Sequence, residues 1–88
     1  MPDLAARTMM ILAVGGHDLN NHLTVLSGCI SQVLDEIAFD HPSRGYLVQA
    51  KHATERSSEI SLAMITFASD HGAKPTASFQ YLIDQEEL

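Results

Sequence analysis

The apolar residues in the first half of the chain recur with alternating spacings of three and four. The members of this repeat are Ala5, Met9, Leu12, Gly16, Leu19, Leu23, Leu26, Ile30, Val33 and Ile37. A 3,4 repeat places its members in one stripe along an α-helix. Sustained over about 33 residues, it predicts a helix roughly 50 Å long at 1.5 Å per residue. Pro2 and Asp3 suit the start of this helix.

A second stripe follows a break in the pattern. His41 precedes a proline, which disfavours helical geometry, so we expect the first helix to end near Phe39. Ser43 is a candidate N-cap for the next helix. Gly72 is a candidate C-cap, because the proline that follows it prevents continuation. The members of the second stripe are Tyr46, Ala50, Ala53, Ser57, Ile60, Met64 and Phe67.

Two long amphipathic helices joined by a short turn form an antiparallel hairpin. One hairpin leaves part of its apolar seam uncovered, whereas two hairpins cover it in a four-helix bundle. The predicted fold is therefore all-α: a long antiparallel helical hairpin that dimerises into a four-helix bundle. In this frame Ile60, Met64 and Phe67 face the part of the first helix that carries His17. Residues 1–72 form this domain, and residues 73–88 form a tail that suits a short helix or a strand.

The composition restricts the classes of partner. The formal charge of −6 argues against nucleic acid, because phosphate binding needs a basic surface. No signal peptide is visible, and no apolar run reaches the length that crosses a bilayer, so this segment should make no membrane contact. The single cysteine, Cys29, cannot form an internal disulfide, which favours a cytoplasmic protein.

The run from Gly15 to Asn21 reads Gly-Gly-His-Asp-Leu-Asn-Asn and brings reactive groups together on the first helix. His17 and Asn21 are one turn apart on one face, with Asp18 beside them. His17 comes one residue after a core position, which places it on the outer side. Neutral imidazole offers a ring lone pair near pH 7, so a histidine beside a carboxylate can accept a phosphoryl group on nitrogen.

This run resembles the phosphoacceptor motif of bacterial sensor histidine kinases, in the branch that reads His-Asp-Phe-Asn-Asn. Leu19 stands in place of the phenylalanine, and Gly16 in place of the usual alanine before the histidine. The similarity continues across the turn to residues 65–69, which are similar to the Leu-Leu-x-Phe-Ser/Ala-Arg end of the second helix. The chain thus resembles the dimerisation and histidine phosphotransfer (DHp, HisKA-like) domain of a two-component sensor kinase.

The resemblance implies a role for each residue of the motif. His17 would be the phosphoacceptor, Asp18 a general base that fixes the imidazole tautomer, and Asn21 the residue that positions water to dephosphorylate a regulator. The implied partners are a second copy of the chain, a response-regulator receiver domain and a kinase ATP-binding domain. No cofactor is expected in this chain, since it has no phosphate-binding glycine loop. ATP and Mg are expected on a separate or missing domain, without which the chain is not an active kinase.

An alternative function is a non-catalytic dimeric helical adaptor that binds a kinase or a receiver domain. Such an adaptor would keep both stripes but would not need His17. The other histidines lack the motif context and are interpreted as ordinary surface residues: His22, His41, His52 and His71. Asp18 and His22 are one turn apart but lack a third ligand, so no metal site is predicted.

Overall fold

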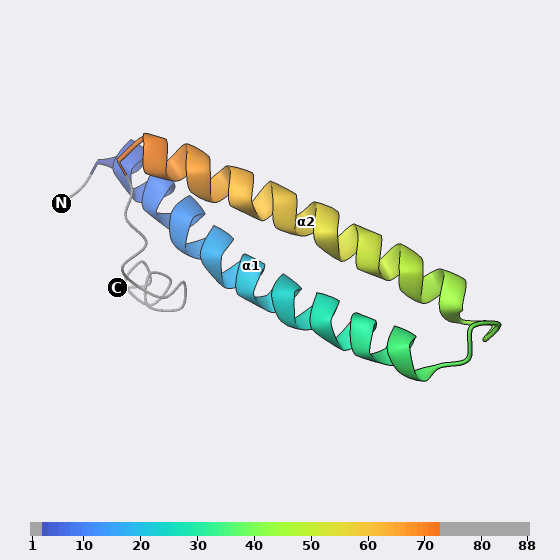
Figure 1. Cartoon of the computed structure of the whole chain (residues 1–88). Helices are drawn as coiled ribbons and strands as arrows, with labels where there is room; N and C mark the ends of the chain where they lie inside the picture. The colour runs from blue at the N-terminus through green and yellow to red at the C-terminus, as the bar shows by residue number, and fades with distance from the viewer. Residues whose placement is uncertain (1–2, 73–88) are drawn as a thin grey trace.

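The computed structural model describes residues 3–72, which form two α-helices and the loop between them (Figure 1). Helix α1 spans Leu4–Glu36 and helix α2 spans Arg44–Asp70. The two helices lie side by side in opposite directions, with the loop at one end of the pair (Figure 1). The prediction of an all-α helical hairpin is confirmed, and the 33 residues of α1 match the length predicted from the repeat. The tail predicted for residues 73–88 lies outside the described residues.

The outer ends of both helices are capped close to where the sequence predicts. The backbone amide of Ala6 donates to the Asp3 carboxylate at 2.7 Å, which satisfies one of the amides that the first turn of α1 leaves without a helical partner. At the end of α2, Gly72 has a φ of +90°. This left-handed conformation favours glycine. The C-cap of α2 is His71, one residue before the predicted Gly72, which reverses the chain just after it.

Helix α1 ends earlier than predicted, at Glu36 instead of near Phe39. The next residue, Ile37, adopts an extended conformation (φ −83°, ψ 155°), although its amide still donates to Val33. The guanidinium of Arg44 donates to the carbonyl oxygen of Leu34 at 3.1 Å and lies over the Phe39 ring, 5.1 Å from its centroid. A cation thus occupies the negative end of the α1 dipole, which stabilises this earlier end.

Ser43 occupies the N-cap position of α2, as predicted, but its side chain makes no capping hydrogen bond. Its backbone lies in the right-handed helical region, with φ −85° and ψ −5°. The amide of Ser43 donates instead to Nδ1 of His41 at 3.0 Å. The imidazole of His41, two residues earlier in the loop, therefore restrains the backbone at the start of α2.

Only half of the predicted α1 stripe faces α2. Its alternate members are buried or half-buried against α2: Met9, Gly16, Leu23, Ile30 and Ile37. Of the members between them, Leu12 is half-buried, whereas Leu19 (44% exposed), Leu26 (52%) and Val33 (41%) are exposed. A single neighbouring helix covers one side of an a/d stripe, so the other side remains open in one hairpin.

The predicted stripe of α2 is wrong as the line of contact with α1. The buried residues of α2 are Thr54, Ser61 and Ala68, which are spaced by seven residues. Of the three residues expected to face the His17 region of α1, Ile60 and Phe67 are 62% and 50% exposed, whereas Met64 is half-buried. Small side chains let the two helices approach closely, so the polar but compact row forms the contact and the larger apolar row is left outside.

Gly16 marks a place where the two helices are packed too closely for a larger residue. A Cβ atom built on Gly16 would lie 2.8 Å from Cγ1 of Ile65 and 3.2 Å from the carbonyl oxygen of Ser61. Both distances are shorter than ordinary contacts, and the second involves backbone that cannot rotate away. The absence of a side chain at Gly16 therefore permits the close approach of α2 next to His17.

Gly16→Ala is expected to destabilise the hairpin, whereas Gly28→Ala is expected to stabilise it. Overpacking costs about 1–3 kcal/mol and exceeds the gain in helix propensity of up to about 1 kcal/mol. At the exposed Gly28 a Cβ would meet no atom within 4 Å, so only the propensity gain of about 0.5–1 kcal/mol remains. Urea unfolding at equal protein concentration measures both. Stabilisation by both alanines would contradict the close packing at Gly16.

Candidate phosphoacceptor site

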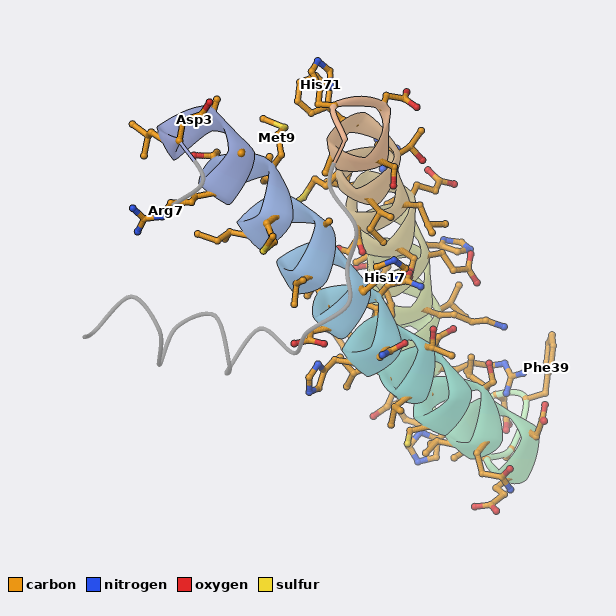
Figure 2. The ribbon with its side chains drawn as sticks, turned by 90° about the vertical axis from the view of Figure 1, so that its left-hand side faces the viewer. Asp3, Arg7, Met9, His17, Phe39 and His71 are labelled. Carbon is orange, nitrogen blue, oxygen red and sulfur yellow. The ribbon has the colours of Figure 1, made fainter. Side chains whose placement is uncertain are left out.

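His17 lies on the outside of α1, directly after the buried Gly16. Figure 2 shows it between the open end of the hairpin, which carries Asp3 and His71, and the loop end, which carries Phe39. One step along a helix turns its surface by about 100°. The exposed position of His17 agrees with the prediction, and it leaves the imidazole accessible to another molecule.

The neighbour of His17 on α2 follows from the helix geometry. Leu62 comes one residue after the buried Ser61, as His17 comes one residue after the buried Gly16. In two antiparallel helices, moving one residue forward along either chain from the point of contact turns the side chain toward the same edge of the pair. His17 and Leu62, which is 51% exposed, therefore flank one edge of the hairpin.

The imidazole of His17 differs from those of three other histidines. Nδ1 of His22 bonds the carbonyl oxygen of Asp18 at 2.7 Å, and Nδ1 of His71 bonds that of Phe67 at 2.7 Å. Nδ1 of His41 accepts from the backbone, as described above. Within residues 3–72, the His17 ring makes no hydrogen bond. An exposed ring without such a bond suits a nucleophile better than one engaged with its own backbone. Among the described residues, His52 is also exposed and without a hydrogen bond, but it lacks the motif context of His17.

The other two predicted site residues lie near His17 but are not joined to it. Asp18 is half-buried and Asn21 is exposed, one turn beyond His17 on the outer surface of α1. The predicted hydrogen bond from the His17 ring to the Asp18 carboxylate is not formed within the described residues. The general-base role of Asp18 and the water-positioning role of Asn21 therefore remain predictions.

The described part of the chain offers no metal centre and no membrane span. Within residues 3–72, no three histidine, cysteine or acidic side chains are grouped so that they could hold a metal ion. Neither α1 nor α2 combines the length and the apolarity that crossing a bilayer requires.

Ser61 is a residue at this site that the sequence analysis missed. Its side chain is fully buried, and its hydroxyl donates to the carbonyl oxygen of Gly16 at 3.0 Å. Hydrophobicity alone predicts that the contact is made by the larger apolar residues at neighbouring positions. Thr54, Ser61 and Ala68 are compact residues that recur every seven positions, as Gly16, Leu23 and Ile30 do in α1. This repeat is the sequence signal that could have indicated the contact.

In comparisons with known proteins, the chain matches no protein-family model, no curated protein and no solved structure. The resemblance to histidine kinases therefore depends on the motif around His17 and on the hairpin that presents it.

Proposed function

We propose that the chain is the phosphoacceptor and dimerisation domain of a two-component histidine kinase. It receives a phosphoryl group on His17 and passes it to an aspartate of a response regulator. The observation that supports this most is the state of His17: an exposed imidazole, without a hydrogen bond in residues 3–72, beside the fixed contact between Gly16 and Ser61. The same residue lies in the sequence context His-Asp-x-Asn-Asn.

The chemistry requires little more from this chain than a well-placed nucleophile. In phosphoryl transfer, catalysis comes from in-line positioning and from neutralising the charge of the phosphate. A ring nitrogen of His17 would attack the γ-phosphorus of ATP, and the bond to the ADP oxygen would break. ATP and magnesium belong to the kinase ATP-binding domain. Asp18 would accept the hydrogen bond of the other ring nitrogen once donor and acceptor are assembled.

A second copy of the chain is the partner that the apolar surface suits. We define the exposed seam as Leu19, Leu26 and Val33 of α1 together with Tyr46, Ala53, Ile60 and Phe67 of α2. We define the contact line as Gly16, Leu23 and Ile30 of α1 with Leu47, Thr54, Ser61 and Ala68 of α2, all buried or half-buried. The seam residues of α1 come three positions after members of this line, and those of α2 come one position before them. At about 100° per residue, three residues forward amounts to a turn of about 60° backwards, and one residue back to a turn of about 100° backwards. Both rows are therefore rotated to the same side of the contact line and lie on one edge of the hairpin.

The exposed seam lies on the edge opposite His17, because one step forward from the contact line turns the surface the other way. Two hairpins that pack through this seam bury it in a four-helix bundle and leave both copies of His17 outside. The bundle thus separates the dimer contact from the phosphoacceptor. A receiver domain and an ATP-binding domain can then reach His17 without opening the dimer.

Phosphorylation assays with purified partners test the proposal. The chain is incubated with Mg-ATP and, in turn, with isolated ATP-binding domains of sensor kinases from the His-Asp-Phe-Asn-Asn branch. We expect a phosphoryl group that is labile in acid and stable in alkali, as a phosphoramidate bond is. A receiver domain added later should remove it and become phosphorylated. Binding of these domains without any phosphoryl transfer would favour the non-catalytic adaptor.

Asn21→Ala is expected to separate two activities of the site. The variant should still accept a phosphoryl group on His17, because the carboxamide takes no part in that attack. Dephosphorylation of a bound regulator should slow on the order of 100-fold, since the attacking water loses its positioning group. The decay of phosphorylated receiver measures this, and Asn20→Ala serves as the control. Equal dephosphorylation by Asn21→Ala and the unaltered chain would remove Asn21 from the mechanism.

A further inference from the structure

Ser61 makes a hydrogen bond unlike those of the threonine hydroxyls in the described helices. The hydroxyls of Thr8, Thr24 and Thr54 each donate to a carbonyl four residues earlier in their own helix. Ser61 donates across to α1 instead, and it does so while 0% exposed. Within residues 3–72, the only other side-chain hydrogen bond between α1 and α2 is that of Arg44 at the loop end.

The acceptor of this hydrogen bond is part of the backbone of the proposed site. The carbonyl of Gly16 and the amide nitrogen of His17 belong to the same planar peptide group. A bond to that oxygen therefore restrains the orientation of the backbone from which the His17 side chain projects. Because Gly16 has no Cβ, Ser61 can approach close enough to make the bond, at the point where Ile65 also packs against α1.

We propose that Ser61 is a positioning residue: it fixes the rotation of the helical turn that carries His17, and the position of that turn along the helix axis, relative to α2. This inference rests on the proposed function of His17. A phosphodonor must meet the imidazole in line, and the edge that it approaches is formed jointly by His17 of α1 and Leu62 of α2. The hydroxyl of Ser61 sets how these two halves of the edge are aligned.

The matched pair Ser61→Ala and Thr54→Val tests this role. Each variant removes one buried hydroxyl from the same contact row, but the Thr54 bond is internal to α2. Ser61→Ala leaves no acceptor orphaned, since the Gly16 carbonyl still accepts the helical amide of Asn20. We expect Ser61→Ala to lower kcat for phosphorylation of His17 by roughly five- to tenfold, with KM for the ATP-binding domain unchanged. Thr54→Val should change neither.

An NMR measurement tests the positioning independently of any phosphorylation. In the unaltered chain, the hydroxyl proton of Ser61 should exchange slowly and show a nuclear Overhauser effect to the His17 amide. In Ser61→Ala, amide shifts and exchange rates should change for residues 16–20, while Thr54→Val should alter only α2. If the chain is never phosphorylated, the proposed function fails. The NMR measurement still tests whether Ser61 restrains the backbone that carries His17. Unchanged amides in Ser61→Ala, or equal effects of both variants, would overturn the inference.

Discussion

Leu26→Glu is expected to convert the proposed dimer into a monomer that is largely unfolded. Leu26 is 52% exposed in the single hairpin and lies in the middle of the exposed seam. Burying it in a bundle contributes about 2 kcal/mol, and a symmetric dimer contains it twice. Losing about 4 kcal/mol weakens association by roughly a thousandfold, and placing two carboxylates in an apolar seam adds to the loss. Light scattering and circular dichroism over a range of concentrations measure both effects.

Val25→Glu is the matched control for this prediction. Val25 is the neighbouring residue and is even more exposed in the single hairpin, at 65%. It projects from the far side of α1, outside the exposed seam, so a carboxylate there remains in water in the proposed bundle. The dimer should therefore persist in Val25→Glu. A folded monomer in the unaltered chain, or equal dissociation by both variants, would contradict the four-helix bundle.

His17→Gln is expected to abolish phosphorylation of the chain while the fold is retained. The glutamine keeps the size and polarity of the side chain but has no nucleophilic ring nitrogen, so labelling should fall to background. Because His17 is exposed, stability should change by less than about 0.5 kcal/mol. Radiolabelled ATP with an active ATP-binding domain measures the first effect, and urea unfolding the second.

His22→Gln provides the comparison for His17→Gln. His22 lies on the same helix and is also exposed, but its Nδ1 is engaged with the Asp18 carbonyl. This variant should be labelled to the same extent as the unaltered chain. Loss of labelling in both variants would indicate a general effect on α1 instead of a specific phosphoacceptor.

The elements of the hairpin could be predicted from the sequence because they depend on local rules. The 3,4 repeat of α1, the Asp3 cap and the glycine at residue 72 each act within one or two turns. The exposure of His17 followed from its offset from Gly16. These features need no knowledge of the partner helix.

The packing of the two helices could not be predicted in the same way. Hydrophobicity identified Ile60 and Phe67 as the contact of α2, but packing distance selected Ser61 and Ala68 instead. An apolar stripe identifies a surface to be covered without saying whether the same chain or a second copy covers it. The hydrogen bond of Ser61 to Gly16 joins residues 45 positions apart, and it became visible only in three dimensions.

Mapping the phosphoryl group is the measurement that tests the central proposal most directly. The chain is phosphorylated by an ATP-binding domain or by a phosphorylated receiver domain, kept at alkaline pH, digested and sequenced by tandem mass spectrometry. The proposal predicts one phosphoryl group, on His17. A phosphoryl group on another residue, or none with any of these donors while the chain still binds them, would contradict it.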